Sequence, residues 1–166
     1  MQLMAQNGVE RYCTFYLDGG YYGIDVACVQ EVLRHHVMTR IPLAPDHISG
    51  LINLRGQIVT AIDLRTGLGL ERRPSGLDAM NGVIRHEGDV ASLLVDEIDD
   101  VITVGRESYE SPPTSLTGKT RELIRAVHKL EANLLLVFDV EKVFECARIE
   151  RQRGNERATN EVHTTQ

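Results

Sequence analysis

Short apolar segments separated by tight turns constrain the fold of this chain more than any other feature of its sequence. Residues 11–17 alternate in polarity, Asp18-Gly19-Gly20 forms a turn signal, and residues 21–24 return as a second apolar segment. The same pattern surrounds Arg55-Gly56-Gln57 and Glu87-Gly88-Asp89. Glycine supplies the positive φ angles that tight hairpins require, and a period of two is typical of strands. Because helical periodicity is almost absent, the sequence predicts an all-β, barrel-type fold with little helix.

The two halves of the chain share one order of elements. In each half a hairpin is followed by an aspartate, an extended segment, a proline-containing connector and a long hairpin. Each long hairpin ends in an apolar strand with one aspartate, Asp63 or Asp139. Aligning these two places Leu130-Glu131-Ala132 where Leu54-Arg55-Gly56 stands, so the Arg-Gly turn belongs to one copy alone. A polar feature found in one copy of a repeat indicates a docking element rather than a folding requirement.

The repeat predicts two β-barrel subdomains of about half the chain each. We place the first over residues 11–80 and the second over residues 81–147, with terminal strands that can be exchanged between them. Residues 1–10 form a polar start without a continuous apolar run, and residues 148–166 contain very few apolar side chains. Such segments bury too little surface to stay ordered, so both are predicted to be disordered.

Composition narrows the cellular context and the class of partner. The net charge of −6 argues against nucleic-acid binding, because phosphate neutralisation needs Lys and Arg. The three cysteines form no C-x-x-C pair and leave an odd one, which is typical of reduced thiols in a cytoplasm. We expect no signal peptide and no direct membrane insertion, since no apolar run reaches the required length.

Motifs for enzymatic chemistry fail on inspection. Thr117-Gly118-Lys119-Thr120 resembles the end of a phosphate-binding loop, but Pro113 stands where that motif needs a glycine. The sequence therefore predicts no catalytic residue and no cofactor. One enzymatic alternative stays open, a two-barrel enzyme that uses Asp63 or Asp139 with Cys28. Against it, each aspartate is expected to satisfy backbone donors at the turn that follows its strand.

Two groups of residues invite a metal-site hypothesis. Asp96, Glu97, Asp99 and Asp100 crowd four carboxylates into five residues, but their spacing is not that of a calcium loop. A solvated acidic turn is the better interpretation. The histidines are either adjacent, and so on opposite faces of a strand, or isolated, and are expected on the surface or in loops: His35, His36, His47, His86, His128 and His163. We predict no metal site.

Several segments together make the chain resemble the CheW family of chemotaxis coupling proteins, from about Tyr12 to Phe144. The most specific segment is Gly50-Leu51-Ile52-Asn53-Leu54-Arg55-Gly56. Others are Tyr22–Val26, Val29–Val32, Ile41-Pro42 with Pro45, Ile62–Arg65, Leu94–Asp96, Gly118 and Phe138–Lys142. The segment Gln57–Ala61 departs from the family pattern, with Thr60 and Ala61 where Pro and Val are common.

The resemblance implies two intertwined five-stranded SH3-like barrels and a non-enzymatic adaptor. Its implied partners are methyl-accepting chemoreceptors, through their cytoplasmic tips, and the regulatory domain of a CheA-type histidine kinase. The implied location is the cytoplasm, at receptor arrays beneath the inner membrane. An alternative is a coupling module of another chemosensory pathway, one that controls surface motility or development. Kinase-contact residues stay unassigned.

Four receptor-contact positions of the family carry over to this chain, each with a structural alternative. Val29 would offer apolar area to a helical hairpin, or belong to the core. Glu31 would pair with a receptor cation, or be a solvated charge. Gly50 would allow close backbone approach, or mark a bulge. Arg55 would offer its guanidinium fork to a carboxylate or amide, or be an ordinary exposed turn residue.

Overall fold

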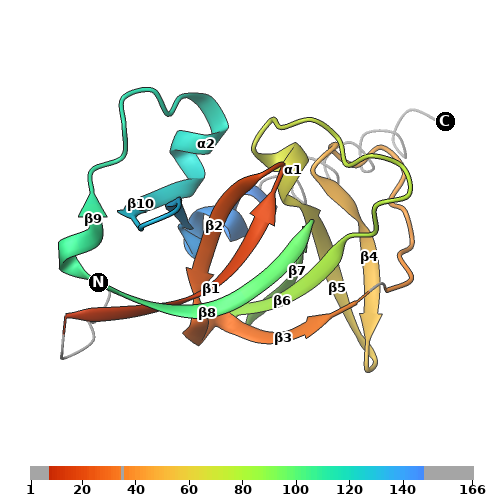
Figure 1. The fold of residues 1–166 in the computed structure, drawn as a ribbon. Helices are drawn as coiled ribbons and strands as arrows, with labels where there is room; N and C mark the ends of the chain where they lie inside the picture. The colour runs from red at the N-terminus through yellow and green to blue at the C-terminus, as the bar shows by residue number, and fades with distance from the viewer. Residues whose placement is uncertain (1–7, 35, 148–166) are drawn as a thin grey trace, which may run out of the picture.

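A computed structural model describes residues 8–34 and 36–147, which form two β-sheets with short helices at their ends (Figure 1). The first sheet has the order β8 (Glu97–Gly105), β1 (Val9–Leu17), β2 (Gly20–Asp25), β11 (Leu134–Phe138), β10 (Ile124–Lys129) and β9 (Tyr109–Glu110). The second has the order β3 (Val29–Leu33), β6 (Met80–His86), β7 (Asp89–Val95), β5 (Gln57–Asp63) and β4 (Ile48–Leu54). The predicted all-β class is confirmed.

The helical elements of residues 8–34 and 36–147 are few and short. They are the α-helices α1 (Leu64–Gly67) and α2 (Gly118–Leu123), the 3₁₀ turns η1 (Val26–Cys28) and η2 (Arg106–Ser108), and a helical segment over 140–147. Among the described residues no helix is both long and apolar enough to cross a membrane. Each sheet takes strands from both halves of the chain. The division into subdomains near residue 80 stays a prediction.

Three hairpins turn through a residue–glycine pair in which both residues have positive φ. The φ angles are 48° and 79° at Asp18-Gly19, 52° and 86° at Arg55-Gly56, and 49° and 85° at Glu87-Gly88. These values are typical of type I′ turns, whose twist matches that of the flanking strands. The hairpins are therefore confirmed, but each loop has two residues, not the predicted three. The third residue of each predicted turn already belongs to the following strand. Gln57, for example, pairs with Leu54.

The predicted repeat reappears as two matching strand–helix units. Asp63 ends β5 and accepts a hydrogen bond on Oδ1 from the Arg65 amide at 3.0 Å, which caps α1. Asp139 follows β11 and accepts one from the Lys142 amide at 3.3 Å, at the start of the 140–147 helix. β5 pairs in parallel with β7, and β11 with β2. Both aspartates thus satisfy backbone donors, as expected.

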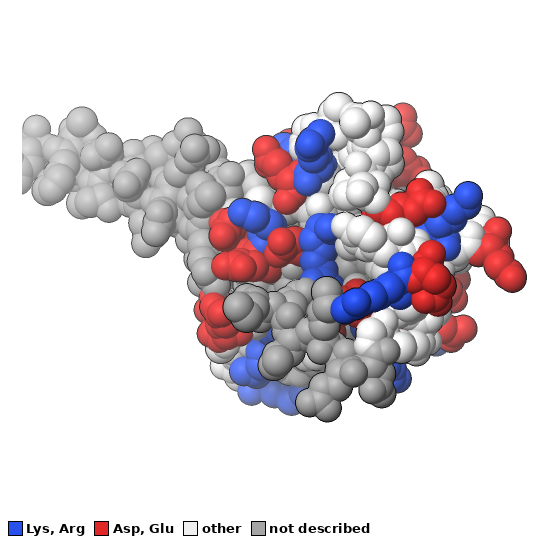
Figure 2. All heavy atoms as spheres, turned by 90° about the vertical axis from the view of Figure 1, so that its left-hand side faces the viewer, with Lys and Arg blue, Asp and Glu red and all other residues white. Residues whose placement is uncertain are grey.

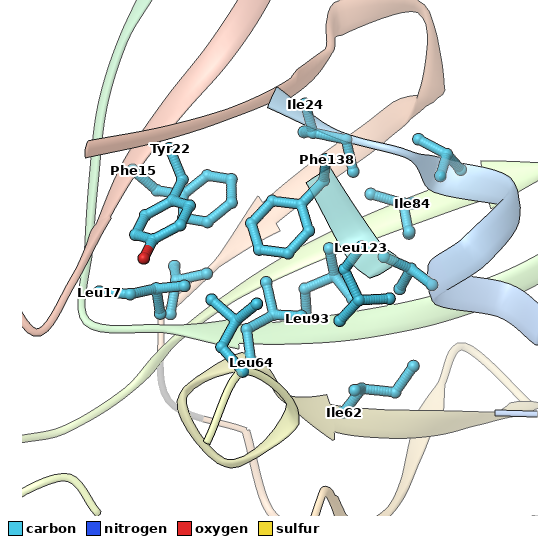
Figure 3. Packing of buried hydrophobic residues seen from close by; sticks show 14 of the residues in the cluster. Phe15, Leu17, Tyr22, Ile24, Ile62, Leu64, Ile84, Leu93, Leu123 and Phe138 are labelled. Carbon is cyan, nitrogen blue, oxygen red and sulfur yellow. The ribbon is translucent and has the colours of Figure 1, made fainter. Parts of the chain in front are cut away.

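The largest of the three hydrophobic clusters among the described residues lies between the two sheets (Figure 3). Phe15, Tyr22 and Phe138 from the first sheet form an aromatic cluster, with ring centroids 5.4 to 6.2 Å apart. Ile84 and Leu93 of the second sheet belong to the same cluster of buried residues. Trp is absent and Phe is scarce, so aliphatic side chains from both sheets supply most of the remaining apolar contact area.

The start of the chain differs slightly from the prediction. β1 begins at Val9, two residues earlier than expected, because Val9 and Glu10 pair with Gly105 and Val104 of β8. The backbone hydrogen bonds of this ladder order a segment that composition alone assigned to a disordered start. The rest of that predicted start, residues 1–7, and the predicted disordered tail, residues 148–166, lie outside the described residues.

Asp96 corrects the interpretation of the acidic run as a solvated turn. Its side chain is only 11% exposed. Its Oδ1 accepts hydrogen bonds from Arg65 Nε at 2.7 Å and from Arg73 Nε at 3.0 Å. The Asp18 amide donates to Oδ2 of the same carboxylate, at 2.8 Å. Arg65 lies in α1, and Arg73 lies in the loop that follows it. The positive charges of both side chains make burial of this carboxylate possible.

Two further contacts extend this ion-pair cluster. Arg73 Nη1 lies 3.7 Å from Asp63 Oδ2, and Arg65 Nη1 lies 3.6 Å from Asp18 Oδ1. Burial raises the pKa of Asp96, but hydrogen bonds from Arg65 and the Asp18 amide, with the charges of both arginines, outweigh burial and hold its pKa below the ordinary value. The cluster ties the β1–β2 turn of the first sheet to the end of β5 in the second.

Candidate functional site

The turn between β4 and β5 presents Arg55 at the tip of a rigid hairpin. Asn53 Oδ1 accepts a hydrogen bond from the Gly56 amide at 2.9 Å, which closes the turn from within. The Arg55 side chain is 75% exposed although its backbone is left-handed. Asn, Asp and Gly take this conformation readily, whereas most other residues are strained in it. The backbone conformation of the turn does not favour arginine, so a role of the arginine side chain explains its presence better.

Glu31 of β3 reaches across to Arg55 and forms a bidentate ion pair. Arg55 Nη1 donates to Glu31 Oε1 at 2.9 Å, and Nη2 donates to Oε2 at 2.8 Å. The hydrogen bonds from Arg55 hold the pKa of Glu31 below its ordinary value. The structure thus brings together two of the predicted contact residues, which sequence reasoning had assigned separate partners. The pair holds the guanidinium in one orientation, and the Arg55 side chain is still 75% exposed.

Val29 and Gly50 lie deeper than the two charges. Val29 begins β3 opposite Ile84 of β6 and packs against the main core with partial exposure. Gly50 is buried in β4, where the β4–β5 register shifts between Ile48 and Gly50. A Cβ built on Gly50 would lie 2.5 Å from the Thr39 carbonyl oxygen. The geometry accords with the structural alternatives for both residues, a core valine and a glycine at a bulge.

The connector before β4 also contributes residues that sequence reasoning missed. His36 Nε2 lies 3.1 Å from the Asn53 carbonyl oxygen, and Thr39 exchanges backbone hydrogen bonds of 2.8 Å with Leu51. These contacts hold the connector along the outer edge of β4. The proline pair in this connector signals an extended segment, but no local pattern in the sequence identifies its pairing strand.

Substitution of Gly50 by alanine tests the close approach of Thr39. We expect Gly50→Ala to lower the free energy of unfolding by about 1–3 kcal/mol, because the new methyl group overlaps backbone rather than a flexible side chain. Chemical denaturation monitored by circular dichroism measures the change. Gly82→Ala is the matched control, since a Cβ on Gly82 in β6 meets nothing within 4 Å. Equal losses in the two variants would contradict the interpretation.

The arrangement is suited to recognition of another protein. Exposed apolar side chains also lie on the neighbouring strands: Val32 of β3 is 45% exposed, and Ile58 of β5 is 58% exposed. An exposed arginine held in one orientation is a common component of protein interfaces. Among the described residues, no group of three His, Cys, Asp or Glu side chains could hold a metal ion.

Comparison with known proteins gives one consistent family. The family model described as CheW-like domain matches residues 11–148. The chain is 31% identical over 142 residues to the chemotaxis protein CheW of Treponema pallidum, covering 83% of this chain and 84% of that one. It is 32% identical over 136 residues to CheW of Bacillus subtilis, covering 82% and 87% respectively.

A solved structure agrees with these sequence matches. The scaffolding protein TtCheW from Thermoanaerobacter tengcongensis superimposes with a TM-score of 0.71 at 30% identity, covering 79% of this chain and 89% of that one. The match includes the arrangement of strands as well as the sequence, so the CheW-like fold is confirmed. The chain belongs to the CheW family of chemotaxis scaffold proteins, and it is not an enzyme.

Proposed function

We propose that this chain is the adaptor that couples the cytoplasmic tips of methyl-accepting chemoreceptors to the regulatory domain of a CheA-type histidine kinase. Membership of a scaffold family supports the role. The observation that carries the receptor side of the proposal is Arg55, an exposed arginine kept at a left-handed turn position and oriented by Glu31. Neither the conformation nor the exposed ion pair is needed for stability, because surface pairs contribute little.

The receptor contact is proposed to centre on the Glu31–Arg55 pair. A receptor carboxylate or side-chain amide would bind the accessible guanidinium edge, while Glu31 keeps the fork in one orientation and is available to a receptor cation at the rim. Val29 and Gly50 are proposed to act beneath this pair. Val29 supports β3 from the core, and Gly50 lets the connector through Thr39 approach β4 closely. Both therefore position the recognition surface.

The partners and the location follow from the coupling role and are part of the proposal. The chain acts in the cytoplasm, at receptor arrays beneath the inner membrane, and reaches the membrane through the receptors rather than by inserting into it. The acidic net charge of −6 supports protein partners rather than nucleic acid. No individual residue is assigned to the kinase contact.

The same contacts would serve a related pathway that controls surface motility or development. Co-purification from the native cell with the full chain as bait distinguishes the two, because it identifies the accompanying receptor and kinase. We expect a transmembrane chemoreceptor and a CheA-type kinase to be recovered together. Recovery of the kinase with receptors of a motility or developmental system would assign the alternative pathway. Recovery of neither protein would contradict the coupling role.

A further inference from the structure

A cavity of about 490 Å³ lies at the β9 end of the first sheet, at the opposite end of the molecule from the Arg55 turn (Figure 1). Figure 2 looks onto this end, where basic and acidic side chains are interspersed. The cavity is lined by Gly8, Glu10, Val104, Gly105, Arg106, Tyr109, Arg125, Ala126 and His128. Its volume lies within the range of small-molecule sites.

His128 of β10 is the most informative group in this cavity. Sequence reasoning placed it on the surface, yet the residue is only 3% exposed. Ser108 Oγ donates its hydrogen to the Gly105 carbonyl oxygen at 2.9 Å, and the same Oγ lies 2.9 Å from His128 Nδ1. Since the hydroxyl hydrogen is already used, Nδ1 must be the donor in the second contact. In the neutral ring, Nε2 then carries a lone pair.

The neutral form of this imidazole is the favoured one. Burial lowers the pKa of His128, the charge of Arg125 lowers it further, and the carboxylates of Glu10 and Glu107 only partly oppose that shift. Nε2 is buried and has no hydrogen-bond partner among the described residues. Tyr109 packs edge-on against the ring at 5.9 Å. An acceptor atom is therefore buried at the cavity wall without a donor.

Glu10 places a second acceptor close to the first. Its Oε2 lies 3.9 Å from His128 Nε2, which is too far for a direct hydrogen bond. Glu10 is held in place by the Tyr12 hydroxyl, which donates to Oε2, and Tyr12 in turn accepts from Arg125 Nη2 at 3.1 Å. Burial raises the pKa of Tyr12 well above its ordinary value, so this hydroxyl keeps its proton.

We propose that this cavity binds a small primary amine whose ammonium group lies between Glu10 Oε2 and His128 Nε2. A single nitrogen can lie within hydrogen-bond distance of two acceptors 3.9 Å apart, provided that the Glu10 side chain turns aside to open the buried Nε2 to the cavity, and the ammonium charge suits the carboxylate. Val104, Ala126 and the exposed ring of Tyr109 provide apolar contact for the body of the ligand. Arg125 is engaged with Tyr12, by a hydrogen bond and by packing over its ring.

Titration of the full chain with benzylamine, followed by the imidazole nitrogen signals of His128, tests the proposal. We expect the free protein to show the tautomer with Nδ1 protonated, and benzylamine to shift the Nε2 signal in a saturable way. Benzyl alcohol, which has the same ring without the charge, should bind about tenfold more weakly. Phenylacetate should not compete, and preferred binding of this anion would mean that the arginines select the ligand, which would overturn the proposal.

Two variants of the chain separate the acceptor pair from general charge attraction. Glu10→Gln should weaken benzylamine binding about tenfold or more, because the ammonium loses its charged partner. Glu107→Gln removes a nearby carboxylate that does not line the cavity and should change the affinity by no more than about twofold. Equal effects of the two variants, or absence of any saturable shift at His128, would overturn the proposal. Thermal unfolding of Glu10→Gln checks that the fold is retained.

Discussion

Replacing Asp96 by asparagine is expected to lower the free energy of unfolding by about 3–5 kcal/mol, because two buried arginines lose the one carboxylate that forms hydrogen bonds with both of them. The side chains of Arg65 and Arg73 are 7% and 10% exposed, so water cannot replace the lost charge. Asparagine has nearly the shape of aspartate, and the change therefore reports the charge rather than a cavity. Urea denaturation followed by circular dichroism measures the loss.

Asp100→Asn is the matched control within the same acidic run. Asp100 is exposed, and a surface substitution of this kind changes stability by about 0.5 kcal/mol or less. The comparison separates burial from the general effect of removing one negative charge. If Asp96→Asn lowered the free energy of unfolding no more than Asp100→Asn does, the ion-pair cluster would not stabilise the contact between the two sheets.

The same cluster predicts a dependence of stability on pH. The pKa of Asp96 lies below its ordinary value in the folded protein, so its contribution is complete above the unfolded value of about 4 and is lost as the pH falls through the folded pKa. The difference in stability between the wild-type chain and Asp96→Asn should therefore be constant from pH 7 to about pH 5 and shrink below about pH 4. A difference that grows on acidification would contradict the assignment.

Replacing Arg55 by asparagine is expected to separate function from stability. Asparagine favours the first position of a type I′ turn, so the variant should be as stable as the wild-type chain or more stable by up to about 0.5 kcal/mol. Loss of the exposed pair with Glu31 offsets little of that gain. Recruitment by the receptor should nevertheless fall, since asparagine cannot present a charged fork to a carboxylate or amide.

Glu87→Asn is the matched control for this substitution. Glu87 occupies the same position of the β6–β7 turn, with a φ of 49° against 52° at Arg55. Both variants therefore change the turn in the same way and remove one exposed charge. Only the Arg55 variant removes a proposed contact, so only that variant should lose binding to the receptor.

Local patterns in the sequence were sufficient for the hairpins and for the repeat. A glycine at the second turn position, with alternating residues on each side, predicted all three two-strand units at Asp18, Arg55 and Glu87. The strand-ending aspartates were also predicted to satisfy local backbone donors, because Asp63 and Asp139 act within three residues of their own position. The loop length was wrong by one residue, since the ladder continues to the turn itself.

Contacts between segments far apart in the chain could not be predicted from the sequence alone. Glu31 and Arg55 are separated by 24 residues, and their pairing depends on how β3 approaches the β4–β5 hairpin. Asp96 looks solvated in an acidic run, yet Arg65, 31 residues away, makes its burial possible. His128 was assigned to the surface because a lone histidine usually lies there. In each case the deciding partner lies on another strand or loop, which composition and spacing do not specify.

Sedimentation of the kinase with receptor-containing membranes tests the coupling role most directly, using the receptor and kinase that co-purify with the chain. We expect the kinase to sediment only when the chain is added. Glu87→Asn should act like the wild-type chain, whereas Arg55→Asn should be needed at about tenfold higher concentration or more. Sedimentation of the kinase without the chain, or equal activity of Arg55→Asn and the wild-type chain, would contradict the proposed coupling.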